Sequence, residues 1–355
     1  MLGENNYSSY EVKDDEVPFA SFEFPAALRT ERYFEEELTV AASLASRFIK
    51  AVEALYAGLG LEISTETDEL ESVVTCVAES VKRNPYTWMY ICNEKHKESY
   101  LIEHALRTSV YSLCIGAMSG LDSKQLVELG VAAALSDVGK IKIPNIILEK
   151  VGALNSAEHA VIRVHPLEGR KLLRNYTELN EAIVDVVVSH HEQVDGQGYP
   201  AGRQGEALSI AARIVAIADA FDAMTSERCY AGARTIRDAV GILWQRKGIQ
   251  FDSQLVERFL TLVGTHPVGS AFEREDPHIR ATILEPDIEF SRKGRVCYRV
   301  MLEEHNKTTR IETVFVSATE AEFSGADISL SALHPVDFCS KLALSQRANL
   351  LKLVR

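Results

Sequence analysis

Apolar residues recur at steps of three and four along most of this 355-residue chain, and this spacing limits the fold more than any other feature. From Glu36 the first such stripe is formed by Leu38, Ala41, Ala45, Phe48, Val52 and Leu55. The same period continues to about residue 264, with almost no strand-like alternation. Because this is the period of an amphipathic helix, the sequence predicts a mainly α fold built around a helical bundle.

Changes in composition and pattern predict four segments. Residues 1–35 are rich in acids and predict a loosely attached arm or an edge strand. Residues 36–95 predict an N-terminal helical region, in which the helix with the buried stripe Val73, Val77 and Val81 ends at Asn84-Pro85. Residues 96–265 form the predicted main domain. After it, "RVCYRVML" and "RIETVFVS" alternate apolar and polar residues as half-buried strands do, which predicts a small β-rich module over residues 266–355. Helix stops or caps are expected at Ser119-Gly120, Asn155-Ser156, Gly241 and Gly248.

Composition narrows the classes of function. Apolar residues make up 46% and charged residues 25% of the chain, as in ordinary globular proteins. The net charge of −13 argues against binding a nucleic acid polymer, since phosphate backbones favour basic surfaces. The six cysteines include no CxxC pair, which favours a reducing compartment. The polar, acidic start and the lack of a long apolar run predict a cytoplasmic protein without a membrane span.

Four of the ten histidines lie within or at the end of apolar-patterned helices, and two aspartates share that setting. These six residues are His104, His165, His190, His191, Asp137 and Asp219. One such histidine alone would usually be a hydrogen-bonded core residue, but a carboxylate on an apolar helix is costly to bury unless it is paired or bound to a cation. Imidazoles with carboxylates form the ligand set of hydrolytic di-metal centres. The remaining six histidines are expected to be surface or capping residues.

The segment "SHHEQVDGQGYP" at residues 189–200 resembles the HHExxDGxGYP signature of HD-GYP domains, which hydrolyse the bacterial second messenger cyclic di-GMP. Further matching segments are "SYLIEHALRTS", "VHPLEGRKLL", "ARIVAIADAFDAMTSERCY" and "GIQFDSQLVERFL". The resemblance covers roughly residues 70–265. It implies an HD-type helical bundle, here with an N-terminal helical extension and the β-rich C-terminal module.

The resemblance also reveals a departure at "LSDVGK", where Ser136-Asp137 replaces the His-Asp pair of the family. It implies a cofactor of one or two divalent metal ions, iron or manganese. The first metal would keep His104, Asp137 and Asp219 and lose one imidazole, whose place water would fill. The second metal would keep a complete set: Asp137, His165, His190 and His191. Tyr100 stands where some members carry a glutamate for a third metal, so no third ion is expected.

The chemistry implied is phosphodiester hydrolysis, with Asp137 bridging two metals and Lys140 stabilising the charge that develops. Glu192 and Asp195 are candidates for orienting the imidazoles, although Asp195 has an equally good interpretation as a turn cap. Gly196 and Gly198 are expected at φ > 0.

The expected substrate-binding residues are Lys140, Gly198, Tyr199, Pro200 and Arg228. Tyr199-Pro200 would offer an aromatic wall to a guanine or ribose, unless the GYP segment is only a tight turn. Ala231 stands where the family usually has a basic residue, so the grip on the ligand phosphates is expected to be weaker or to rely on another cation.

Three functions fit these residues. The first is a cyclic di-GMP phosphodiesterase with an altered first metal site. The second is a catalytically impaired domain that acts as a cyclic di-GMP-binding or protein-interaction effector, which Ser136 and Ala231 motivate. The third keeps the chemistry for another nucleotide, against which the GYP loop argues. The resemblance implies bacterial signalling and contact with diguanylate cyclases. The N-terminal helices are a candidate homodimer surface or part of the core.

Overall fold

The computed structural model describes residues 33–93, 99–226, 234–264, 268–269, 271–274, 279–292, 295–304, 310–316 and 334–336. Contacts divide these residues into two units. The first unit holds residues 43–79 and the described residues of 96–259, and the second holds the described residues up to 42, those of 80–95, and those from 260 onward. Residues 36–95 are therefore shared between the units, a division that differs from the segment boundaries expected from the sequence.

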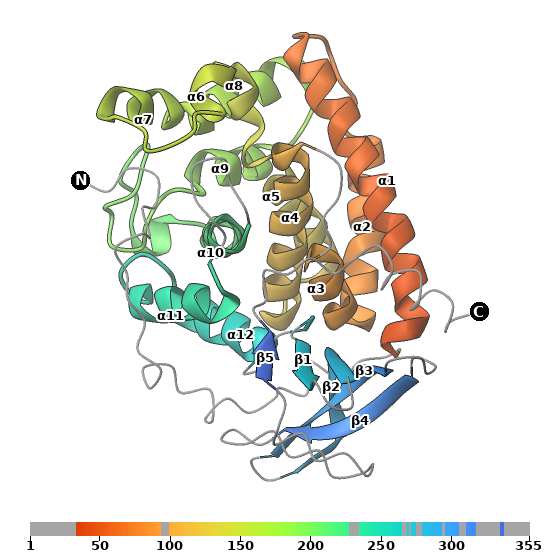
Figure 1. Cartoon of the computed structure of the whole chain (residues 1–355). Coiled ribbons are helices and arrows are strands. Elements are labelled where there is room, and N and C mark those ends of the chain that lie inside the picture. The colour runs from red at the N-terminus through yellow and green to blue at the C-terminus, as the bar shows by residue number, and fades with distance from the viewer. Residues whose placement is uncertain are drawn as a thin grey trace. The chain divides into compact units, whose positions relative to one another are not determined.

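The helices follow one another along the chain to residue 263 and make the fold mainly α, as predicted (Figure 1). Their bounds are α1 Phe34–Gly60, α2 Asp68–Arg83, α3 Pro85–Asn93, α4 Tyr100–Met118, α5 Ser123–Leu135, α6 Asn145–Leu148, α7 Ser156–Ile162, α8 His165–Tyr176, α9 Glu181–Ser189, α10 Ile210–Thr225, α11 Ile236–Arg246 and α12 Ser253–Val263. Short 3-10 helices add η4 Val138–Lys142 and η5 Gly205–Ala207.

The predicted apolar stripes are the buried faces of these helices. Every stripe residue named for the first helix is buried in α1, and Val73, Val77 and Val81 are buried in α2. The expected stop at Gly120 is confirmed, because this residue follows α4 with a φ of 77°. The expected stop at Gly241 is wrong, since this residue is buried inside α11, where the surrounding apolar positions continue the helix.

The core of the first unit lies where α4, α5, α9 and α10 pack together. Phe221 of α10 makes edge-on contacts with Tyr111 of α4 at 5.2 Å and with Phe259 at 4.8 Å, measured between ring centroids. Such a buried aromatic side chain stabilises the fold by about 1.5–3 kcal/mol relative to an exposed one. These contacts fix α10 against α4, and both helices carry candidate site residues.

The second unit contains an antiparallel sheet in the order β4-β3-β2-β1-β5. Its strands are β1 Ala271–Arg274, β2 Ile279–Arg292, β3 Arg295–Glu304, β4 Arg310–Val316 and β5 His334–Val336. The two segments with strand-like alternation thus form β3 and β4. Buried Glu285 of β2 accepts hydrogen bonds from Phe34 N at 3.2 Å, Asn84 Nδ2 at 2.7 Å and Arg299 Nη1 at 2.5 Å.

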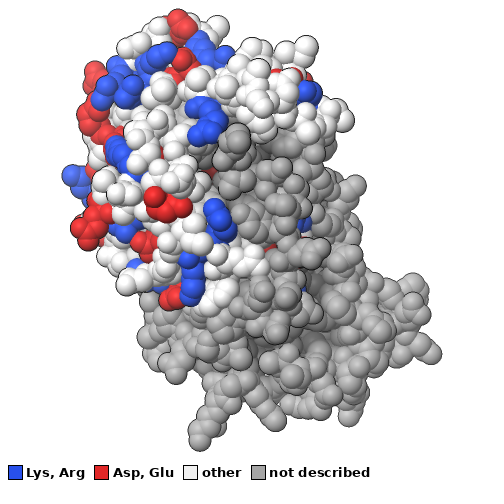
Figure 2. All heavy atoms as spheres, turned by 90° about the vertical axis from the view of Figure 1, so that its left-hand side faces the viewer, with Lys and Arg blue, Asp and Glu red and all other residues white. Residues whose placement is uncertain are grey.

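Within the described residues, no helix has both the length and the apolar character needed to cross a bilayer. Acidic and basic side chains are interspersed over the described part of the face in Figure 2. This mixture differs from the one-sided basic surface that nucleic acid polymers select.

Candidate metal centre

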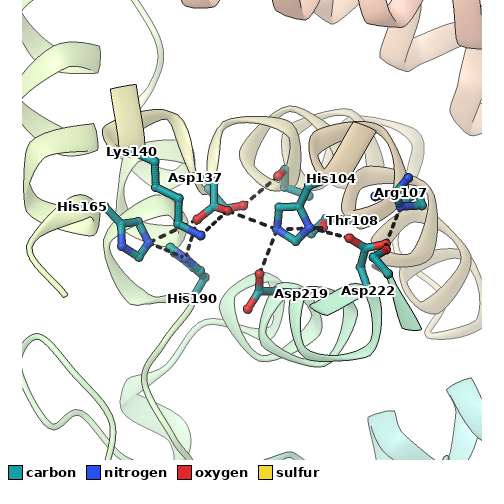
Figure 3. Close-up of polar contacts among 12 residues, drawn as sticks. His104, Arg107, Thr108, Asp137, Lys140, His165, His190, Asp219 and Asp222 are labelled. Carbon is teal, nitrogen blue, oxygen red and sulfur yellow. Dashed lines mark hydrogen bonds and ion pairs between the residues drawn. The ribbon is translucent and has the colours of Figure 1, made fainter. Parts of the chain in front are cut away.

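Asp137 lies at the junction of α5 and η4, between His104 on one side and His165 and His190 on the other (Figure 3). Its Oδ2 is 3.2 Å from Nε2 of His104 and 2.8 Å from Nζ of Lys140. Its Oδ1 is 3.3 Å from Nε2 of His165 and 3.9 Å from Nε2 of His190. One buried carboxylate thus presents one oxygen to each group, which is the arrangement of a bridging ligand.

The first group combines His104 of α4, Asp137 and Asp219 of α10, whose ligand atoms lie within 4.8 Å of one another. His104 Nε2 is 3.0 Å from Asp219 Oδ1. Burial alone would lower the pKa of His104, but Tyr100 and three surrounding aspartates raise this pKa well above its usual range. A proton on His104 and a divalent cation are therefore alternative ways of balancing these carboxylates.

The second group combines Asp137, His165, His190 and His191, again with ligand atoms within 4.8 Å of one another. His165 is the first residue of α8 and donates its Nδ1 proton to Ile162 O at 2.9 Å. His190 ends α9 and donates its Nδ1 proton to Val187 O at 2.7 Å. Because a carbonyl only accepts, the two Nε2 atoms of the neutral rings must both carry lone pairs.

These acceptors face one another across a short distance. The Nε2 atoms of His165 and His190 are 3.3 Å apart. Within the part of the chain that the structure describes, Asp137 Oδ1 and His191 Nε2 are buried and accept no hydrogen bond. Burial, reinforced by His165, lowers the pKa of His190 to about 4, and burial lowers the pKa of His191 well below its usual value. Neutral imidazole lone pairs and a carboxylate oxygen converging without a proton donor fit a divalent cation.

Asp137 and Asp219 remain ionised in this setting. Burial alone would raise the pKa of Asp137, but the charge of Lys140 and the hydrogen bond from His104 bring it well below its usual value. Burial likewise opposes ionisation of Asp219, and the hydrogen bond from His104 with the neighbouring His191 lowers its pKa. Both carboxylates are thus available as anionic ligands at neutral pH.

Behind His104 lies a second layer of contacts that was not predicted from the sequence. Buried Asp222 of α10 accepts the Nδ1 proton of His104 at 2.6 Å, and its other oxygen accepts from Arg107 Nε at 2.5 Å and Ser226 Oγ at 2.9 Å. Arg107 also donates to Glu103 at 3.0 Å. The available signal was spacing, because Asp222 follows Asp219 by three residues and so shares its helix face.

Ser136 does not point its proton at the metal-ligand candidates. This buried residue ends α5, and its hydroxyl donates to Ala133 O, one turn back, at 2.9 Å. The hydroxyl therefore completes the helix end, and the first group contains a single imidazole.

Two glycines permit close approaches that position the ligands. A Cβ on Gly139 would lie 1.9 Å from His165 O, so η4 packs directly on the first turn of α8. A Cβ on Gly198 would lie 2.4 Å from Glu192 Cα. Gly196 has the expected positive φ, 81°, whereas Gly198 is not among the positive-φ residues. The expectation for Gly198 was wrong, because its lack of a side chain serves packing of the loop instead.

The two acids expected to orient the imidazoles have other partners. Buried Glu192 accepts hydrogen bonds from Ala201 N at 2.7 Å and Arg203 N at 3.1 Å, and so fastens the following loop. Asp195 accepts from Gln197 N at 2.9 Å, which is the turn-capping role. Backbone carbonyls orient His165 and His190 in their place.

Tyr199 borders a small recess beside the second group. Its lining residues include His190, His191, Tyr199 and Asp219. The Tyr199 ring stacks on His191 with centroids 4.8 Å apart, and the guanidinium of Arg163 lies over the same ring at 4.3 Å. Pro200 is exposed, and the expectations for Arg228 and Ala231 lie outside the described residues.

The part of the chain that carries these residues is similar to known proteins. Residues 94–255 match the family model of the HD domain. A Pseudomonas aeruginosa protein named as a cyclic di-GMP phosphodiesterase is 31% identical over 251 residues, which span 71% of this chain and 60% of the relative. A Vibrio cholerae protein named as a 3'3'-cGAMP-specific phosphodiesterase is 35% identical over 158 residues, or 44% of this chain and 30% of the relative.

The fold has a solved counterpart. The structure of an HDG"Y"P protein from Bdellovibrio bacteriovorus aligns with a TM-score of 0.54 and 16% identity, covering 63% of this chain and 71% of that one. The helical fold is shared with that structure, and residues 94–255 match the HD domain model. The resemblance of this part of the chain to HD-GYP domains is confirmed. The chain spans less than two thirds of either relative described above.

Proposed function

We propose that this chain is a metal-dependent phosphodiesterase that hydrolyses cyclic di-GMP and that its two metal positions are unequal. The observation that carries the proposal is the convergence of lone pairs from His165 and His190 on Asp137 Oδ1. The similarity to relatives named as cyclic dinucleotide phosphodiesterases supports the reaction and the substrate class.

The residues would have the following roles in this reaction. His165, His190, His191 and Asp137 would hold one divalent ion, and His104, Asp137 and Asp219 would hold another. Such ions, iron or manganese by their ligand set, supply a nucleophile from water and neutralise charge on the phosphate. Asp137 would contribute one carboxylate oxygen to each of the two groups. Lys140 places its ammonium 2.8 Å from that carboxylate, where it can stabilise negative charge that develops on the substrate.

The two metal positions differ in the protein ligands that they offer. The second group offers three imidazoles and a carboxylate, whereas the first offers one imidazole and two carboxylates. With the Ser136 proton directed at Ala133 O, the first position lacks a fourth protein ligand among the described residues. We expect the second position to bind metal more tightly, and water to complete the first.

The deciding experiment is cyclic di-GMP hydrolysis by protein purified without oxygen and supplied with excess Fe²⁺ or Mn²⁺. Parallel assays should contain 3'3'-cGAMP, because a relative is named for it. Turnover that His190→Ala abolishes and that the matched change His159→Ala, in α7, preserves would support the proposal. A folded protein loaded with metal but without turnover on either nucleotide would contradict it.

Ser136 specifically favours a second candidate, a cyclic di-GMP-binding effector without useful turnover. The effector would bind the nucleotide tightly and leave it intact across the metals tested. Binding measured by calorimetry beside the hydrolysis assay separates the two functions, since the effector predicts heat of binding with no product.

A further inference from the structure

The geometry points to Arg163 as a substrate-binding cation that holds the second phosphodiester of a cyclic dinucleotide while the first one reacts. This inference rests on the proposed function and names a contact that the sequence motifs did not include. A cyclic dinucleotide carries two phosphodiester groups in one ring, so a site that cleaves one must accommodate the charge of the other.

Arg163 reaches the site through two stacked rings. It lies in the turn between α7 and α8, two residues before His165. Its guanidinium carbon is 4.3 Å from the centroid of the Tyr199 ring, which stacks on His191 at 4.8 Å with an angle of 25° between the planes. Arg163 and His191 thus both pack on the ring of Tyr199.

The charge of Arg163 has no counter-ion within the described part of the chain. Its guanidinium packs on the Tyr199 ring, whereas Lys140 pairs with Asp137 and Arg203 pairs with Asp185. A guanidinium stacked on an aromatic ring keeps its N–H groups at the edge, where they suit bidentate binding of phosphate oxygens. Arg163 is also only partly buried, so these donors are accessible to a ligand.

The reacting phosphate has cations of its own. The metal-ligand candidates and Lys140 would hold it, whereas the guanidinium of Arg163 packs on Tyr199, the ring that stacks on His191. Arg163 is therefore left to meet the other phosphodiester of the same nucleotide with its N–H edge.

This arrangement also changes the expected role of Tyr199. The ring already packs against both Arg163 and His191, and it supports the guanidinium. Arg163 thereby supplies a cation beside the second group.

The test is the binding of cyclic di-GMP and of the linear dinucleotide GpG, which has a single phosphodiester, to metal-loaded full-length protein by calorimetry. Arg163→Gln should weaken cyclic di-GMP binding about tenfold or more, the effect of losing a charge-assisted hydrogen bond, and change GpG binding less than twofold. In the hydrolysis assay KM should rise while kcat stays near its original value, because this contact is the same in ground and transition states.

Matched variants control for charge and stacking. Arg174 of α8 forms an exposed ion pair with Glu181 of α9. Arg174→Gln removes the same charge there and should leave both affinities unchanged. Arg163→Lys keeps the charge without the planar fork and should recover part of the lost affinity. Metal content measured on each variant reports whether the ligands remain in place.

The outcomes separate the inference from the function beneath it. Equal losses for both nucleotides, or no recovery with lysine, would make Arg163 a support for Tyr199 and overturn the inference. Unchanged cyclic di-GMP binding in Arg163→Gln would overturn it as well. Unmodified protein that binds no cyclic dinucleotide would instead refute the proposed function, and the inference with it.

Discussion

The Nε2 atoms of His165 and His190 lie 3.3 Å apart while both rings donate their Nδ1 protons to backbone carbonyls. Two lone pairs are therefore held close together in a buried site, beside the oxygen Asp137 Oδ1. Such an arrangement is unfavourable without a cation, and binding a cation relieves the repulsion. We therefore expect stability and metal binding to be linked in this fold.

Metal removal should destabilise the protein. Ligand at one hundred times its dissociation constant stabilises a native state by about 2.7 kcal/mol, so Mn²⁺ should raise the thermal midpoint measurably and a chelator should reverse the shift. Calorimetric scans of His190→Ala provide the comparison. If the variant gained as much stability from Mn²⁺ as the unmodified protein, the second group would not be the main binding position.

Replacing Ser136 by histidine should add an imidazole near the first group. We expect Ser136→His to raise metal occupancy and to increase the hydrolysis rate about tenfold or more, judged against the 10–100-fold effects of supporting residues around metals. Ser136→Ala is the matched control, because it removes only the hydrogen bond to Ala133 O. Metal analysis after gel filtration gives the occupancy, and equal occupancy in the two variants would contradict the expectation.

Asp222→Asn should weaken the first position by about 10–100-fold in metal affinity, since the carboxylate fixes the ring of His104. The buried Arg107 would lose its ionised partner in the same variant. Asp185→Asn makes the same chemical change at the more exposed pair with Arg203 and should leave metal affinity unchanged. Titration of both variants with Mn²⁺ measures their metal affinities. Equal affinities of the two variants would contradict the prediction.

Acid should destabilise the metal-free protein partly through His190. The pKa of this residue is lowered by burial, and further by His165, to about 4, against about 6.5 in the unfolded chain. The unfolded state therefore binds the proton first as pH falls, and about 3 kcal/mol of stability is lost between pH 6.5 and 4.

Urea unfolding of metal-free protein at pH 7.5 and pH 4 measures this loss. His190→Gln lacks the titrating ring, so its stability should fall by about 3 kcal/mol less than that of the unmodified protein over the same range. His104, whose raised pKa has the opposite effect, is present in both proteins and cancels. Parallel losses in the two proteins would contradict the assignment.

The helices and the metal-ligand candidates could be predicted from the sequence because periodicity and motif are local properties. The stripe through Phe48 and Val52 fixed the buried face of α1, and alternation over residues 295–302 indicated β3. Imidazoles and carboxylates on apolar helices likewise indicated a convergent site, and the structure gathers all six of those residues into the two groups.

Partners that depend on three-dimensional proximity could not be predicted in the same way. Arg107 and Asp222 are 115 positions apart in the chain, and nothing in either segment reveals their ion pair. Glu192 follows two ligand candidates and suggested a role in orienting them, yet the loop folds back so that its carboxylate meets backbone amides. The type of residue also did not reveal whether Gly198 serves an unusual φ or a close contact.

The contact of Gly139 with the backbone of His165 sets the distance between Asp137 and the second imidazole group through main-chain atoms. Any side chain at residue 139 would force η4 away from α8 and widen the centre. A site framed in this way can exchange one ligand for another, as at residue 136, without altering the spacing between those that remain. Single substitutions can therefore change the ligands of the centre, while the packing of the backbone keeps the distances between the remaining ligands.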